Sequence, residues 1–413
     1  MRRICRFLLL AAASFVSFPQ ALQAAETVRV AVIETLSSPP AVVGQWWTNH
    51  VQWAVDQVNA NGGVLDGRKI EVVTFDTKGS PQEALIAFKA VTDQGIRHLF
   101  GTTGSHVAIA LTEAVAKHNE RNPGRSVLFL NYGGQTPELT NEKCNFWHFR
   151  FDVHADQKVI ALIKQVAAQK NARKVYLLNQ DYAYGQAVQK LSRELLVKSR
   201  PDIQIVGDDL IQLQKTKDFS PYIAKIRASG ADTVITSNWG PDLILMMRAS
   251  HDARLPAMYY TLNSHFTGTP TAIGEAGDGH LINVSSWHPN IADGKLEKYY
   301  LGYKKKYKEE WNMLPHKSAV EMWARAVDAS KSVDPVAVAK ALENMRYDAG
   351  TGAMWMRADD HQLMHPVYAF SFQKAGRPGV KHDVENTGFG WKTEGRFEAG
   401  DTVLPTNCRM ERP

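Results

Sequence analysis

A serine and a histidine stand side by side in the stretch GTTGSHVAIALTEAVAKHNE, residues 101–120. Such a pair raises the question of nucleophilic catalysis, in which a histidine takes the proton of a serine hydroxyl. A nucleophile elbow reads GxSxG, however, whereas Ser105 lies in TGSHV. Side chains adjacent in sequence are also rarely placed so that one deprotonates the other. We therefore predict that the chain is not an enzyme, and a secreted serine hydrolase that uses Ser105 and His106 is the weakest alternative.

The same residues fit a site that holds oxygen atoms of a small ligand. IRHLF (96–100) has the pattern of a buried strand and VAIALTEAVAKHNE (107–120) that of a helix, so the glycine-rich turn joins the two. Glycine allows a ligand to approach the backbone, and the free N–H groups of a first helical turn attract an anionic or carbonyl oxygen. An alternative is that Ser105 only caps the helix. The residues predicted here as ligand-binding are Thr103, Ser105 and His106.

Four further loops follow predicted strands and are rich in Gly, Ser, Asn, Tyr and Trp. They are NYGGQTPELT (131–140), NQDYAYGQAVQK (179–190), SNWGPD (237–242) and TLNSHF (261–266). Because parallel sheets bind ligands at the carboxyl ends of their strands, we expect all five loops to share one pocket. Each aromatic residue could instead be an ordinary core or turn residue. The predicted ligand-binding residues of these loops are Tyr132, Gly133, Gln135, Asp181, Tyr184, Trp239 and Asn263.

Strand-like and helix-like segments alternate along the chain and position these loops. VRVAVI (28–33) and IEVVTF (70–75) read as buried strands, and Ser80, Pro81 and Glu83 signal the start of a helix. Such alternation predicts parallel sheets with helices on both faces. Because 413 residues exceed one compact core, we expect two domains.

The N-terminus has the features of a secretory signal peptide, predicted as residues 1–24. Arg2, Arg3 and Arg6 precede a short apolar run, and ALQA follows it; the alternative is a membrane-buried or core helix. Cys5 precedes the apolar run, so it is not the cysteine that carries lipid in lipoproteins. Removal of this segment lowers the formal charge from +6 to +3, which gives no argument for nucleic acid as a partner. We predict a soluble secreted protein that is not a lipoprotein.

Two cysteines remain after cleavage, Cys144 and Cys408. In an oxidising compartment an even pair indicates one disulfide, and two buried thiols are the alternative. The sequence contains no CxxC or HExxH, and no P-loop or GxGxxG follows a strand. We therefore predict no metal and no cofactor.

Four motifs in order resemble one known family. VAVIETLSSP (30–39), AVDQVNANGGVLDGRKIEVVTFDTKGSPQEAL (54–85), GGQTPELT (133–140) and QDYAYG (180–185) together resemble the type I periplasmic solute-binding proteins of ABC importers, in particular the leucine and branched-chain amino-acid-binding family. The resemblance implies a two-lobed α/β fold in which each lobe is a doubly wound parallel sheet with helices on both faces. Three chain crossings, near residues 149–153, 284–287 and 347–351, would form the hinge. Lobe 1 would be residues 25–150 plus 285–346, and lobe 2 residues 151–284 plus 347–413.

The resemblance also implies roles for single residues. Ser105 matches the serine that binds the ligand carboxylate, Gly133 and Gln135 match the contacts of the next turn, and Tyr184 and Trp239 match lining aromatic positions. Two positions depart from the pattern. Asn263 stands where leucine-binding members have an acid for the ligand ammonium, a role that Asp181 or Asp242 would have to fill. Val43 stands at an aromatic position, for which Trp46 or Trp47 could compensate, and Trp47 is the predicted ligand-binding residue there.

The function implied is that of an extracytoplasmic substrate-binding protein of an ABC transporter. It would capture a branched-chain amino acid or a related small carboxylate or amide, with an aromatic body as one option, by hinge closure. A monomer would then deliver this small-molecule ligand to the permease subunits in the inner membrane. The alternative with the same fold is a ligand-sensing receptor of a signalling system.

Overall fold

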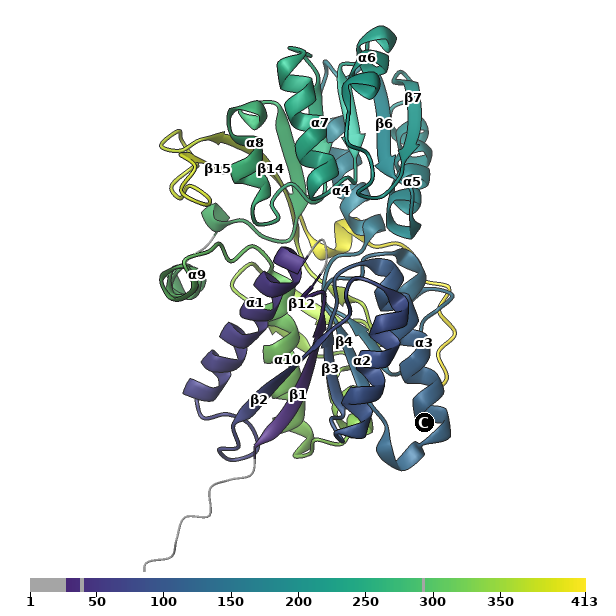
Figure 1. Ribbon diagram of the computed structural model, residues 1–413, viewed down its shortest axis with the longest axis vertical. Helices are drawn as coiled ribbons and strands as arrows, with labels where there is room; N and C mark the ends of the chain where they lie inside the picture. The colour runs from purple at the N-terminus through teal and green to yellow at the C-terminus, as the bar shows by residue number, and fades with distance from the viewer. Residues whose placement is uncertain (1–26, 38–40, 292–293) are drawn as a thin grey trace, which may run out of the picture.

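The computed structural model describes residues 27–37, 41–291 and 294–413. The predicted signal peptide, residues 1–24, lies outside the described residues. The chain forms two lobes, one above the other in Figure 1. No helix in these described ranges is long and apolar enough to cross a membrane.

The first lobe, at the bottom of Figure 1, is built on a five-stranded parallel sheet in the order β2-β1-β3-β4-β5. The strands are β1 Val28–Glu34, β2 Ile70–Asp76, β3 His98–Gly101, β4 Leu128–Asn131 and β5 His148–Arg150. The helices of this lobe are α1 Ala41–Ala60, α2 Pro81–Asp93, α3 Ser105–Arg121, α9 Gly294–Tyr307, α10 Leu314–Ser330 and α11 Pro335–Leu342.

Both faces of this sheet are covered by helices. Successive side chains of a strand point to opposite faces. Accordingly, Val28, Val30 and Val32 of β1 join a core with α1 and α10, whereas Ala31 and Ile33 join a core with α2 and α3. Strands buried on both faces are typical of doubly wound sheets, so the predicted fold class is confirmed for this lobe.

The second lobe contains a seven-stranded sheet in the order β15-β14-β10-β9-β8-β6-β7. Its strands are β6 Lys174–Gln180, β7 Gln204–Ile211, β8 Thr233–Thr236, β9 Met258–Thr261, β10 Leu281–Ser285, β14 Val367–Lys374 and β15 Phe389–Phe397. The helices are α4 Ala155–Ala167, α5 Ala183–Ser199, α6 Ser220–Ser229, α7 Pro241–Asp252 and α8 Thr269–Ile273. Strands β6 to β9 are parallel, as predicted, and β10, which was not predicted as a strand, joins them in parallel. Strands β14 and β15 add two antiparallel strands at one edge.

A third, small antiparallel sheet follows α11. It consists of β11 Arg346–Asp348, β12 Ala353–Met356 and β13 Leu363–Met364. Tyr347, Met354 and Met356 of this sheet belong to the core of the first lobe, before the chain re-enters the large sheet of the second lobe at Val367. The lobe boundaries given in the sequence analysis remain a prediction.

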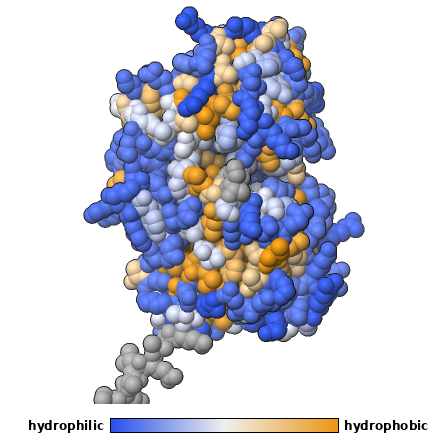
Figure 2. All heavy atoms as spheres, viewed as in Figure 1, coloured by the Kyte–Doolittle hydropathy of each residue, from blue (hydrophilic) through white to orange (hydrophobic). Residues whose placement is uncertain are grey.

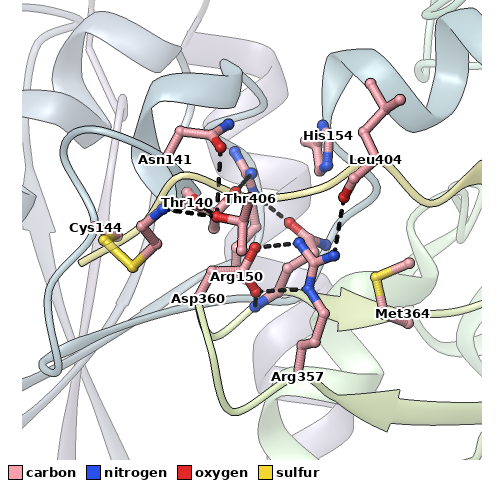
Figure 3. Close-up of polar contacts among 12 residues, drawn as sticks. Thr140, Asn141, Cys144, Arg150, His154, Arg357, Asp360, Met364, Leu404 and Thr406 are labelled. Atoms are coloured by element: carbon pink, nitrogen blue, oxygen red, sulfur yellow. Dashed lines mark hydrogen bonds and ion pairs between the residues drawn. A yellow bond between two sulfur atoms is a disulfide. The ribbon is translucent and has the colours of Figure 1, made fainter. Parts of the chain in front are cut away.

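Arg150, the last residue of β5, is fully buried where the chain leaves the first lobe (Figure 3). Its guanidinium donates from Nε to Oε1 of Gln362 at 2.5 Å, from Nη1 to the Thr136 carbonyl at 2.5 Å, and from Nη2 to the Thr140 hydroxyl. The amide of Gln362 in turn donates to the Asp152 carbonyl at 2.9 Å. This arginine therefore fixes the start of the passage between the lobes.

The C-terminal tail contacts both lobes beside this passage. On the second lobe, Nζ of Lys164 donates to the carbonyl of Asp401 at 2.8 Å. On the first lobe, the Thr406 hydroxyl donates to the Thr140 carbonyl at 2.8 Å, and Cys408 forms a disulfide with Cys144 (Figure 3). The predicted disulfide is confirmed.

Candidate functional site

A small cavity lies between the lobes, at the carboxyl ends of their parallel strands. The empty space between its atoms is about 360 Å³, which includes the solvent at its open side. Figure 2 shows a largely hydrophilic surface with apolar residues gathered in patches, one of them at the waist where the lobes meet. The cavity is lined by Val43, Trp47, Thr103, Gly104, Ser105, Gly133, Gln135, Tyr182, Tyr184, Trp239, Asn263 and Phe266.

The five predicted loops and the first turns of α1 meet at this cavity. Eight predicted residues are among its lining residues: Trp47, Thr103, Ser105, Gly133, Gln135, Tyr184, Trp239 and Asn263. The structure places His106, Tyr132 and Asp181 outside the lining. The lining residues missed from the sequence are Val43, Gly104, Tyr182 and Phe266, although the last three lie in predicted loops.

Ser105 joins two loops of the first lobe. It is the first residue of α3, and Gly104 occupies the N-cap position without a side-chain hydrogen bond. The hydroxyl oxygen of Ser105 accepts from the backbone N–H groups of Gln135 and Thr136, both at 3.2 Å. The alternative that this serine only caps its own helix is therefore wrong. The two bonds use only the oxygen, so the hydroxyl proton of Ser105 remains available, and the first N–H groups of α3 have no side-chain cap.

Two glycines bring the backbone close to the cavity. Gly104 has a φ of 89°, and a Cβ there would lie 2.9 Å from Cε1 of His106. A Cβ at Gly133 would lie 2.4 Å from Cζ3 of Trp47. Both positions therefore need glycine, one for its conformation and one for its closeness to a ring.

His106 points away from Ser105. Its Nε2 lies 3.2 Å from the Gly79 carbonyl, and its ring meets that of Tyr182 at 6.5 Å. Within the described part of the chain, no hydrogen bond joins the serine hydroxyl to this imidazole. The pair therefore lacks the contact on which nucleophilic attack depends.

A buried carboxylate lies beneath the first loop. Oε2 of Glu34 accepts from the backbone N–H of Thr103 at 3.1 Å and from its hydroxyl at 2.6 Å. Burial raises the pKa of Glu34 to about 7, while the hydrogen bonds from Thr103 act in the opposite direction. The two polar hydrogens of Thr103 are thus directed at Glu34 and away from the cavity.

Aromatic rings from both lobes meet across the cavity. Trp47 of α1 contacts Phe266, in the loop after β9, edge-to-face at 5.8 Å. Tyr132 lies behind Trp47, with their ring centroids 6.0 Å apart, and is fully buried. Trp239 and Phe266 of the second lobe also belong to the core cluster of the first. The lobes are therefore in contact around the site.

The side chain of Gln135 connects the cavity to the passage between the lobes. Its Nε2 donates to Asp152, and its Oε1 accepts from Nζ of Lys158 at 3.0 Å. Asp152 and Lys158 are both buried, and the ammonium lies 3.7 Å from the carboxylate. Burial raises the pKa of Asp152, and the nearby Lys158 opposes that rise. This amide is therefore engaged by a buried ion pair at the start of α4.

The wall from the second lobe carries neutral polar groups. Nδ2 of Asn263 donates to the Ser237 carbonyl at 3.1 Å and to the Tyr184 hydroxyl at 3.2 Å. The Tyr182 hydroxyl accepts from Nε1 of Trp239 at 2.9 Å. Burial raises the pKa of both tyrosines, so both remain protonated donors.

The two acids considered for an ammonium partner are engaged elsewhere. Asp181 is exposed and accepts from Nε2 of Gln186 at 2.7 Å. Asp242 accepts from Nε2 of Gln180 at 2.7 Å and from the N–H of Gln214 at 2.8 Å. Neither lines the cavity. Across the described ranges, no group of three or more His, Cys, Asp or Glu residues could hold a metal ion.

The sequence is similar to those of known binding proteins. A family model described as periplasmic binding protein matches residues 27–377. The chain is 33% identical over 406 residues to the Leu/Ile/Val-binding protein homolog 4 of Brucella melitensis, and the match covers 94% of each chain.

Solved structures with similar folds include two that bear on the architecture. The leucine-, isoleucine-, valine-, threonine- and alanine-binding protein of Brucella ovis, in its closed conformation, matches with a TM-score of 0.86 at 30% identity, covering 94% of this chain and all of that one. A solute-binding protein of an ABC transporter from Rhodopseudomonas palustris, in complex with 4-hydroxybenzoate, matches with a TM-score of 0.78 at 20% identity, covering 90% of this chain and 97% of that one. The second likeness shows the fold alone.

Proposed function

The chain belongs to the periplasmic binding protein family, and on that premise we propose that it is the extracytoplasmic substrate-binding protein of an ABC transporter. It captures a small solute between its lobes and delivers the solute to the permease subunits in the inner membrane. The observation that carries this proposal is the cavity between the lobes, whose walls come from strand-end loops of both lobes.

The first lobe receives an oxygen-rich group of the ligand. The hydroxyl proton of Ser105 and the first N–H groups of α3 are donors at the positive end of a helix. A carboxylate or carbonyl oxygen suits them. Trp47 supports the apolar body of the ligand from the same side.

The second lobe closes over the ligand with Tyr182, Tyr184, Trp239, Asn263 and Phe266. Closure is a hinge motion, favoured because the ligand contacts both walls only in the closed arrangement. The ring contact of Trp47 with Phe266 supports this reading, since it joins the lobes directly.

The chain acts as a monomer in the periplasm after removal of residues 1–24. Two other functions compete with transport. A ligand-sensing receptor would bind the same solute and hand the closed form to a signalling protein, whereas a hydrolase would release a product. Co-purification with permease subunits favours transport, and turnover of an ester or amide would refute both binding roles.

Ligand capture is tested by thermal unfolding of the mature protein. The panel contains leucine, isoleucine and valine, their amine-free carboxylates, and small aromatic carboxylates. A ligand at 100 times its Kd should add about 2.7 kcal/mol to the free energy of unfolding. Tyr184→Phe should lower the affinity for the ligand that binds, because it removes a hydroxyl from the cavity lining. Tyr222→Phe on α6 is the matched control away from the cavity. Equal affinities in the two variants would contradict this site.

A further inference from the structure

None of the side chains that line the cavity is ionised. The twelve lining residues include five aromatic side chains, and none is Asp, Glu, Lys or Arg. Residues of both lobes line the site, so a ligand bound between them loses part of its water. A charged group buried without a partner of opposite charge is strongly disfavoured. The two ends of the cavity therefore decide which charges a ligand can carry.

The end formed by α3 suits a negative charge. The helix begins at Ser105 with Gly104 before it, so no side chain covers its first N–H groups. The serine oxygen already accepts two backbone N–H groups, which leaves its proton for the ligand. A carboxylate can bind here to several donors without any positively charged residue.

The end formed by Asn263 is neutral. The amide orientation is fixed by its neighbours, because the Ser237 carbonyl only accepts, and the group facing it at 3.1 Å must therefore be the NH2. The Oδ1 atom consequently lies on the other side, is buried, and has no hydrogen-bond partner among the described residues. This oxygen is a neutral acceptor on a residue of the cavity wall, while the NH2 of the same amide also donates to the hydroxyl of Tyr184.

The carboxylates outside the lining are held by other groups. Asp152 is paired with Lys158 at 3.7 Å and also accepts from Gln135. Glu34 accepts from Thr103 through Oε2, and burial raises its pKa to about 7. Asp242 accepts from the amide of Gln180. Oε1 of Glu34 and Oδ1 of Asp242 have no hydrogen-bond partner among the described residues, but neither residue lines the cavity. An ammonium in the cavity would therefore meet no carboxylate of the lining.

We propose, resting on the proposed function, that the ligand is a small monocarboxylate that carries no ammonium group. Its carboxylate binds at the start of α3, its apolar body packs between Trp47, Trp239 and Phe266, and any polar group at its far end is a neutral donor to Asn263 Oδ1. Asn263 is the residue that sets this preference.

The test compares matched ligands that differ only in the amine. Isothermal titration of the mature wild-type protein measures 4-methylpentanoate against leucine, and 3-phenylpropanoate against phenylalanine. We expect the amine-free member of at least one pair to bind ~10-fold more tightly or better, the loss expected for one unmet charged contact. An amino acid that binds as tightly as its amine-free partner overturns the inference and leaves the proposed function intact.

Variants then assign the preference to one side chain. Asn263→Asp should shift the ratio of affinities toward the amino acid by ~10-fold or more, because it supplies the missing negative charge. Asn263→Ala should weaken both members without reversing the preference. Asn171→Asp adds the same charge at an exposed turn and should leave the ratio unchanged. If Asn263→Asp folds and the ratio of affinities is unchanged, Asn263 does not set the preference. If that variant does not fold, the two ligand pairs measured on the wild-type protein still decide the ligand class. Failure of all four compounds to bind counts against the proposed function and overturns this inference with it.

Discussion

The hydroxyl of Ser105 should hold two loops together in addition to facing the ligand. Ser105→Ala removes the acceptor for the N–H groups of Gln135 and Thr136, which are both buried. Each buried donor left without a partner costs about 1–3 kcal/mol. Because the two donors are adjacent and relax together, we expect a loss of about 2–4 kcal/mol in the free energy of unfolding.

Ser192 provides the matched control for this substitution. It is a fully buried serine of α5 whose hydroxyl has no hydrogen-bond partner among the described residues. Ser192→Ala should therefore change the free energy of unfolding by less than ~1 kcal/mol. Both variants delete the same atom from a buried serine, so their difference isolates the two hydrogen bonds.

Urea unfolding followed by tryptophan fluorescence measures both values. The midpoint of Ser105→Ala should fall while the slope m stays at the wild-type value, since the surface exposed on unfolding is unchanged. Equal losses in the two variants, or no loss in Ser105→Ala, would show that the serine oxygen does not accept from the second loop.

Three further predictions concern the passage between the lobes and the buried acid. Cys408→Ser should lower the free energy of unfolding by about 2–5 kcal/mol, because the disulfide spans a sequence separation of 264 residues. Cys144→Ser should give the same loss, and the double variant should lose no more than either single variant. Additive losses in urea unfolding would contradict a single shared bond. Arg150→Met should cost about 3–5 kcal/mol, since it leaves three buried acceptors without their donor, and a loss below ~1 kcal/mol would contradict the network. For Glu34, the folded pKa of about 7 lies above the ordinary 4.5, so the folded state binds the extra proton and stability falls as pH rises from 4.5 to 7. Glu34→Gln should remove up to ~3 kcal/mol of this fall, measured by urea unfolding across that range, and parallel curves for the two proteins would refute it.

The fold could be predicted from the sequence because its local signals agree. Ser80 is the N-cap of α2, its hydroxyl accepts from the N–H of Glu83 at 3.2 Å, and Pro81 is the first helical residue. The apolar runs expected as strands became the parallel parts of both sheets. The two antiparallel edge strands were harder to predict, because β14 pairs with β10, which lies far earlier in the sequence. Their partner is chosen by tertiary packing.

The loops of the site could be predicted, but not which side chain of each loop faces the cavity. Tyr182 lines the cavity while its neighbour Asp181 is exposed, although both stand in the same predicted loop. His106 follows Ser105 on α3, and one helical residue turns the side chain about 100° around the axis, which carries the imidazole toward Gly79. Glu34 was missed as a neighbour of the site; the signal was an acid at the end of the apolar strand VRVAVIE.

The bond between Cys144 and Cys408 turns the chain between them into a covalent ring. Cys144 lies just before β5 of the first lobe, and the ring includes the whole large sheet of the second lobe. A ring that starts and ends in one lobe must pass between the lobes an even number of times. The tail after Asp401 therefore supplies a fourth passage between the lobes, beside the three that the chain makes before it. A single peptide bond can be cut anywhere inside the ring and the two lobes remain covalently joined in one molecule.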